Sequence, residues 1–189
     1  MGDHIIVVSG LPRSGTSMLM QMLAAGGVPP LTDGSRVADV DNPKGYFEFE
    51  RVKGLPGDTG WVDEAHGKVV KVIHRLVTQL PEGHLYKVLF VERDLDEVIS
   101  SQTKMLARLG KTGAGLPAER LKAIFRQEMD RTLSAIEGRQ GFEVLRVPHA
   151  GLIAAPAEQA SLIDVFVGRG LDVARMAAVV DRALYRNMV

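Results

Sequence analysis

The sequence predicts an α/β fold in which a central parallel sheet lies between two layers of helices. Short apolar runs rich in β-branched residues alternate with longer amphipathic stretches along the chain. The apolar runs have the length of buried strands, and the amphipathic stretches have the length of helices. Strands that alternate with helices pair in parallel through right-handed crossovers, which places helices on both faces of the sheet. The 189 residues suit one domain, residues 1–189, with a substantial core.

The first strand and the first helix flank a glycine-bounded turn. Ile5 to Val8 is a β-branched strand, and a helix runs from about Gly15 to Ala25, where Gly26-Gly27 ends it. The same criteria predict strands at 68–73, 86–91 and 142–147, and helices at 94–109, 118–137, 156–167 and 173–184. The segment 28–67 carries turn signals too closely spaced for long regular elements. We expect part of this irregular segment to line the substrate site as a lid, anchored by its aromatic residues Tyr46, Phe47, Phe49 and Trp61. A disordered insertion is the alternative.

The turn between the first strand and helix has the spacing of a phosphate-binding loop. Gly10 and Gly15 are separated by four residues, and strand, glycine turn and helix are the context in which backbone N–H groups face an anion. The ATP- and GTP-binding loop requires lysine after the second glycine, but this chain has Thr16 there. In this chain, the cation nearest to the turn is Arg13, which lies inside the turn itself. A structural turn without a ligand is the alternative.

Bulk composition limits the partners. Lysine plus arginine equals aspartate plus glutamate, at 23 each, so no net charge favours nucleic acid or an anionic membrane. The absence of cysteine excludes disulfides and thiol chemistry and fits a reducing compartment. No stretch is long and apolar enough for a signal peptide or an integral membrane segment. We therefore expect a cytoplasmic protein. Its oligomeric state stays open, and a homo-oligomer is compatible with the sequence.

Polar residues follow the second and third strands. His74 lies just past the second strand, and Arg93 lies at the end of the third, eight residues before the helical Ser101. Because ligands of parallel sheets bind at the carboxyl ends of the strands, we expect these residues and the glycine loop to share one edge. Arginine and serine provide charged and neutral donors for a phosphate. Alternatively, Arg93 pairs with Asp94 or Asp96 at the start of the helix.

These motifs together resemble the family of sulfotransferases that use 3′-phosphoadenosine 5′-phosphosulfate (PAPS), and in particular its small bacterial members. The family carries a Pro-Lys/Arg-Ser-Gly-Thr-Thr/Ser loop, a strand-end arginine with a serine eight residues on, and a Lys-Thr-His stretch with Leu-Pro seven residues after the histidine. The corresponding stretches here are 10–17, 42–48, 71–81, 93–101 and 166–172, with the tail 180–187. Lys71 is displaced by one residue from the lysine of the family pattern. The resemblance implies a sulfotransferase fold, similar to that of P-loop nucleoside triphosphatases.

The resemblance also implies roles for individual residues. The loop would hold the 5′-phosphate of PAPS, Arg13 would stabilise the leaving group, and Arg93 with Ser101 would hold the 3′-phosphate. His74 would accept the proton of the acceptor, with Glu48 as a rival base. Arg169 is the residue available to close over the nucleotide. The cofactor-binding residues so predicted are Gly10, Pro12, Arg13, Ser14, Gly15, Thr16, Ser17, Arg93, Ser101 and Arg169.

The implied reaction moves the sulfuryl group of PAPS to a hydroxyl or amine of a small-molecule, sugar or lipid acceptor, and it requires no metal. The sequence shows no clustered His/Asp/Glu set that indicates one. Two other functions remain open. One is a nucleotide kinase or triphosphatase with an altered loop, in which Ser17 contacts magnesium. The other is a non-catalytic protein that binds 3′,5′-diphosphoadenosine (PAP) or another nucleotide.

Overall fold

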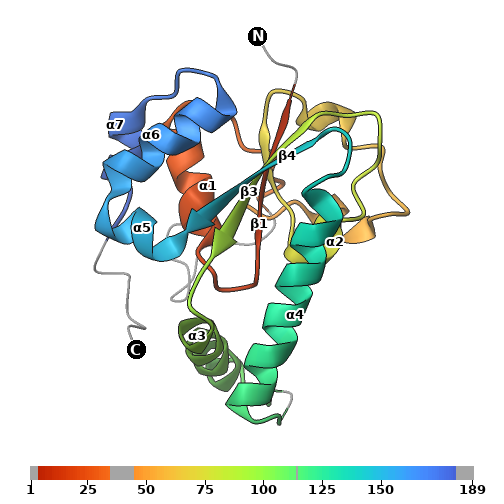
Figure 1. The fold of residues 1–189 in the computed structure, drawn as a ribbon, viewed down its shortest axis with the longest axis vertical. Coiled ribbons are helices and arrows are strands. Elements are labelled where there is room, and N and C mark those ends of the chain that lie inside the picture. Colours follow the sequence, from red (N-terminus) through yellow and green to blue (C-terminus); the bar gives the residue numbers. More distant parts are fainter. Residues whose placement is uncertain (1–3, 35–44, 114, 182–189) are drawn as a thin grey trace.

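A computed structural model describes residues 4–34, 45–113 and 115–181. Its centre is a parallel sheet of β1 (Ile5–Gly10), β2 (Val69–Lys71), β3 (Tyr86–Glu92) and β4 (Phe142–Pro148), in the order β2-β1-β3-β4 (Figure 1). The chain passes from β1 to β2 on one side of β1 and then crosses to β3 on the other side. The carboxyl end of β1 is therefore the point at which the direction of the connections reverses, where parallel sheets bind ligands.

Alternate residues of each central strand enter two separate cores. In β1, Ile5 and Val7 pack on one face of the sheet, and Ile6 and Val8 pack on the other. This alternation follows from the two-residue period of a strand. Both faces are apolar because both are covered, which explains the unbroken hydrophobic run in the sequence.

The helices divide between these faces. Those of one face are α1 (Thr16–Ala25), α5 (His149–Ala154), α6 (Pro156–Val167) and α7 (Val173–Ala178). The other face is covered by α2 (His74–Val77), α4 (Ala118–Ile136) and the short 3₁₀ helices η1 (Glu50–Gly54) and η2 (Asp63–Ala65). The remaining helix, α3 (Leu95–Arg108), packs beside α4 beyond the carboxyl edge of the sheet (Figure 1). The predicted three-layer α/β/α fold is confirmed.

Several boundaries differ from the sequence prediction. The short helices α2 and α5 were not predicted, because four and six residues are too few to show a helical period. The predicted strand 68–73 is reduced to Val69–Lys71, since Ile73 already caps α2. The last helix ends at Ala178. Residues 182–184 of its predicted range, and residues 42–44 of the second motif, lie outside the described residues.

The described part of the irregular segment is anchored as expected. Trp61 is fully buried, and Phe49 packs against it edge-on with ring centroids 5.8 Å apart. The indole N–H of Trp61 donates to the carbonyl of Asp58 at 3.0 Å. Tyr46 is also buried. These contacts fix residues 45–67 against the sheet. None of the described helices is both apolar enough and long enough to span a membrane.

Candidate active site

Both glycines of the loop are required by close contacts. Gly10 has φ 148°, and a Cβ there would lie 2.7 Å from the carbonyl oxygen of Val91 and 2.7 Å from Ser14 Oγ. Gly15 has φ 105°, and its Cβ would lie 2.5 Å from Cδ2 of His149. Only glycine accepts these backbone conformations and approaches without strain. The loop is therefore pressed between β3 on one side and α5 on the other.

The connection from β3 to α3 holds the loop from outside. Arg13 has a left-handed backbone, φ 75°, and its Nε donates to Ser101 Oγ at 2.9 Å. Arg93 Nη1 donates to the carbonyl of Arg13 at 3.0 Å, and Gln102 Nε2 donates to the carbonyl of Pro12 at 3.0 Å. The structure thus brings Arg13, Arg93 and Ser101 together, as the shared sheet edge implied.

The loop has features of an anion site. The first N–H groups of a helix have no partner within the helix, and the positive end of the α1 dipole lies at Thr16. Ser14 Oγ is buried and has no hydrogen-bond partner among the described residues. A buried hydroxyl in that state indicates a place where a ligand or water oxygen completes the hydrogen bonding. Cationic side chains beside the loop make a phosphate a chemically suitable ligand.

Arg93 is paired with a carboxylate of its own helix. Its Nε donates to Glu97 Oε2 at 2.8 Å, and the two side chains are only 9% and 10% exposed. The alternative considered from sequence named Asp94 or Asp96, but Asp94 instead accepts from the backbone N–H groups of Asp96 and Glu97 as the N-cap of α3. The guanidinium is therefore fixed beside the loop, in an orientation set by Glu97 and by the carbonyl of Arg13.

Lys71 reaches the loop from the end of β2. Its Nζ lies 3.4 Å from Ser17 Oγ, donates to the carbonyl of Tyr46 and lies 3.8 Å from Glu48 Oε1. The side chain of Lys71 is 10% exposed. Glu48 is thereby brought to the same side of the site as the first turn of α1. The lysine that departs from the family spacing by one residue nevertheless contacts the predicted 5′-phosphate loop.

His74 is directed toward α4. Its Nε2 lies 3.0 Å from Glu128 Oε2, and its Nδ1 is buried without a hydrogen-bond partner among the described residues. Burial raises the pKa of Glu128, but hydrogen bonds from Arg75 and His74 outweigh it, and the net pKa is lowered. His74 therefore lies at the carboxyl edge beside an ionised carboxylate. Of the two predicted bases, Glu48 is the one joined to the loop through the contacts of Lys71.

The placement of Arg169 requires a correction. Its guanidinium donates to the carbonyls of Gly67 at 2.7 Å and His4 at 3.1 Å, which precede β2 and β1. Gly168 and Gly170, with φ 72° and 67°, turn the chain there at the amino edge of the sheet. Arg169 is thus at the end of the sheet opposite to the loop. Its position does not support the predicted closure over a nucleotide.

One residue at this edge was missed from the sequence. His149 follows β4 directly, is 5% exposed and packs on Gly15. Burial and, secondly, the positive charge of Arg93 lower its pKa to about 4, while Glu97 opposes the shift. The imidazole is therefore neutral at pH 7. The strand-end rule that identified Arg93 would have identified His149 if applied to β4 as well.

Comparison with known proteins supports the fold assignment. No family model and no curated protein matches the sequence. Among solved structures, the sulfotransferase domain from the curacin biosynthetic pathway matches with a TM-score of 0.53 and 16% identity, over 100% of this chain and 92% of that chain. The sulfotransferase domain of the Synechococcus PCC 7002 olefin synthase gives 0.52 and 15%, over 97% and 80%.

A sugar kinase from Janibacter sp. HTCC2649 also matches, over 95% of this chain and 99% of that chain, at 15% identity. Its TM-score of 0.43 is too low to support an argument from similarity. The two sulfotransferase domains, together with the parallel sheet and the glycine loop after β1, establish the architecture. This chain has the fold of the sulfotransferase domains.

Proposed function

We propose that the protein is a sulfotransferase that moves the sulfuryl group of PAPS to a hydroxyl or amine of a small-molecule, sugar or lipid acceptor. The observation that carries the proposal is the convergence of Arg13, Lys71 and Arg93 on the glycine loop at the start of α1. The three cations come from three different elements, although the chain has no net charge. Glu48 and Glu97 lie against two of these cations, and the remaining positive charge, together with the positive end of the α1 dipole, suits a phosphate.

The loop would bind the 5′-phosphate of the donor. The N–H of Ser14 donates to the carbonyl of Leu11 at 3.1 Å, so the backbone N–H groups of residues 15–17 would bind this phosphate, and the hydroxyls of Thr16 and Ser17 would add donors. Arg93 and Ser101 would bind the 3′-phosphate that distinguishes PAPS from ATP. In the structure, Ser101 Oγ accepts from Arg13 and Arg93 pairs with Glu97. Ser101 could donate its hydroxyl proton to the 3′-phosphate while it still accepts from Arg13, so donor binding would preserve this contact.

In the transfer step, the acceptor oxygen or nitrogen forms a bond to sulfur while the bond from sulfur to the 5′-phosphate oxygen breaks. The electron pair of the broken bond stays on that phosphate oxygen, beside Arg13 and Lys71, and the acceptor proton passes to a base. The protein contributes chiefly positioning and stabilisation of the departing charge, and no metal is required. We favour Glu48 over His74 as the base, because Glu48 is joined to the loop through Lys71.

Calorimetric titration with PAP, ADP and magnesium-ATP tests donor recognition. We expect tight binding of PAP without metal, and binding of ADP weaker by at least about tenfold, the usual effect of charge-assisted hydrogen bonds to one phosphate. Arg93→Ala should remove this preference and weaken ADP binding by a smaller factor than PAP binding, because Arg93 also holds the loop through the carbonyl of Arg13. A preference for magnesium-ATP would instead support the altered kinase or triphosphatase. Tight PAP binding with no transfer to any acceptor would indicate that the protein binds nucleotides without catalysing transfer.

The choice of base is tested by the transfer rates of two variants. Glu48→Gln should lower the transfer rate by about a hundredfold or more, because general base catalysis contributes about that much. Glu50→Gln is the matched control, since Glu50 is exposed and pairs with Lys53. His74→Gln should mainly affect stability. The reverse result, with the rate lost in His74→Gln alone, would reassign the base to His74.

A further inference from the structure

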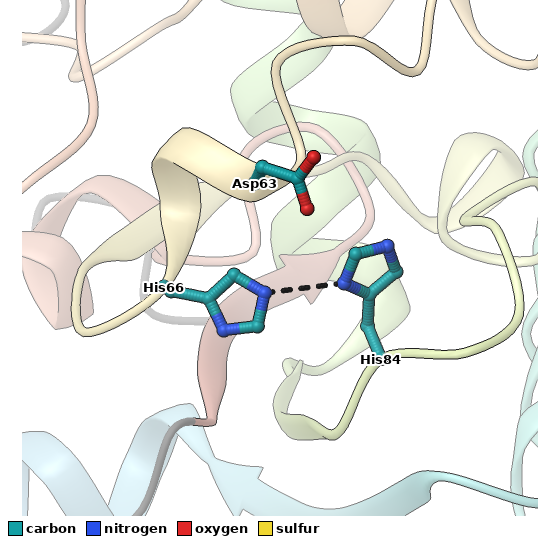
Figure 2. A group of neighbouring side chains, drawn as sticks. All are labelled: Asp63, His66 and His84. Atoms are coloured by element: carbon teal, nitrogen blue, oxygen red, sulfur yellow. Dashed lines mark hydrogen bonds between the residues drawn. The ribbon is translucent and has the colours of Figure 1, made fainter.

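The amino edge of the sheet holds a cluster of metal-ligating side chains. Asp63 from η2, His66 from the turn that follows it and His84 from the loop before β3 each offer a ligand atom, and these atoms lie within 4.8 Å of one another. Figure 2 shows the Asp63 carboxylate directed toward the space between the two imidazole rings. The sequence showed no such cluster, because 18 residues separate the histidines and the sheet brings them together.

The geometry of the two histidines fits a tetrahedral ion. His66 Nε2 and His84 Nδ1 are 3.2 Å apart. Two nitrogens bound to one zinc ion at about 2.05 Å in tetrahedral geometry lie about 3.3 Å apart. One ring donates a hydrogen bond to the other, which keeps both nitrogens directed at the same space. Ion binding requires the donating ring to carry its N–H on its other nitrogen, so that His66 Nε2 and His84 Nδ1 both present lone pairs to one ion.

The ligand set and its exposure indicate the kind of ion. Two imidazoles and a carboxylate suit zinc and its first-row neighbours, whereas calcium and magnesium prefer oxygen ligands alone. Asp63 is exposed and both histidines are half-buried, so an ion can enter from solvent. The Asp63 carboxylate also offsets part of the charge of the ion. A water molecule would complete the tetrahedron.

We propose that Asp63, His66 and His84 form a binding site for a divalent transition-metal ion of the zinc type. The site joins η2, at the end of the irregular segment, to the loop that enters β3. It lies at the opposite end of the strands from the glycine loop, about 20 Å away for strands of this length. The ion therefore takes no part in sulfuryl transfer. The ion links residues 63–66 to the loop before β3 and thereby stabilises the folded chain.

Metal titration of the full chain, first stripped with EDTA, tests the site. We expect one Zn²⁺ or Co²⁺ per chain with a micromolar or tighter Kd, and an intense visible absorption from tetrahedral Co²⁺. At a free Zn²⁺ concentration about a hundredfold above Kd, Tm should rise by about 5 to 10 °C. Mg²⁺ and Ca²⁺ should not compete. No saturable binding by the unmodified chain would overturn the proposal.

Variants separate this site from adventitious binding. His66→Gln and His84→Gln should each lose the Co²⁺ absorption, and Asp63→Asn should weaken binding by at least about tenfold. His4→Gln is the matched control, because His4 lies at the same edge but its imidazole faces Glu143. Binding that is unchanged in His66→Gln and His84→Gln would contradict the site. Asp63 is exposed, so Asp63→Asn should preserve the fold. An unchanged metal affinity in that variant would show that the Asp63 carboxylate is not a ligand of the ion.

Discussion

At the residue scale, Gly15 is the point where the phosphate loop meets α5. Its left-handed backbone and its contact with His149 are separate constraints, and each excludes a side chain. Gly27 has nearly the same φ, 103°, but nothing lies within 4 Å of the position of its Cβ. The two glycines therefore form a natural pair for separating backbone strain from steric contact.

Gly15→Ala should destabilise the protein more than Gly27→Ala. The backbone term is about 1 to 2 kcal/mol in both variants, and displacement of the His149 ring adds about 1 to 3 kcal/mol to Gly15→Ala alone. Urea denaturation measures both free energies of unfolding. Gly15→Ala should also weaken PAP binding, whereas Gly27→Ala should not. Equal losses of unfolding free energy in the two variants would show that the His149 ring moves aside without a measurable energetic cost.

Individual site residues were predictable where chain order and sheet geometry agree. Gly10, Arg13, Arg93 and Ser101 lie together because the carboxyl ends of parallel strands share one edge and because Ser101 lies about two turns into the helix that follows Arg93. Arg169 was predicted to close over the nucleotide, but its guanidinium contacts the carbonyls of Gly67 and His4. The sequence of a glycine turn does not show at which edge of the sheet the turn lies. The metal cluster depends on contacts between distant loops.

At the element scale, α3 determines the state of the loop. Asp94 caps this helix, and the helix carries Glu97, Ser101 and Gln102, which bind Arg93, Arg13 and the carbonyl of Pro12. We therefore expect a substitution of Asp94 to affect the glycine loop through α3, although Asp94 is exposed and far from the loop in sequence. The N-cap of α7 offers the same chemistry away from the site, because Asp172 accepts from the backbone N–H of Arg175.

Asp94→Ala and Asp172→Ala should each cost about 1 kcal/mol of stability, the usual effect of losing an N-cap. Only Asp94→Ala should also weaken PAP binding, by several-fold, because fraying of the first turn of α3 loosens Glu97 and hence Arg93. Thermal unfolding and calorimetry check the two effects. Equal PAP affinities in the two variants would show that α3 does not transmit its order to the loop.

The elements themselves were largely predictable, because long strands and helices have clear periods. The predicted helix 118–137 and the predicted strand 86–91 differ from α4 and β3 by one residue each. The misses were the short helices α2 and α5, whose residues adopt helical backbone only because the sheet edge and the loop contacts hold them. The strand order β2-β1-β3-β4 could not be predicted from the sequence either, because several strand orders are compatible with right-handed crossovers.

At the scale of the whole molecule, burial of neutral His149 makes stability depend on pH. Its folded pKa of about 4 lies below the ordinary value of 6.5. Between these values the unfolded chain binds more protons at this position than the folded chain, so stability rises with pH. The stabilisation is fully present above pH 6.5 and is lost as the pH falls toward 4.

Replacement of His149 should therefore flatten the pH dependence. The full shift corresponds to at most about 3 kcal/mol, and His149→Gln should remove that part of the loss between pH 6.5 and 4, whatever its cost at pH 7. Carboxylates contribute to acid unfolding in both proteins, so the difference between the two curves is the quantity to measure. Parallel curves from urea denaturation across this range would contradict the assignment of a depressed pKa to His149.

The anchoring of Arg13 by Ser101 and Arg93 has a consequence for how ligands bind. The left-handed backbone at Arg13 is imposed by contacts from another element before any ligand arrives. The entropy of ordering the loop is therefore lost during folding rather than at binding. A phosphate meets a preorganised cradle, and a small anion should bind with little change in heat capacity, because almost no further apolar surface becomes buried.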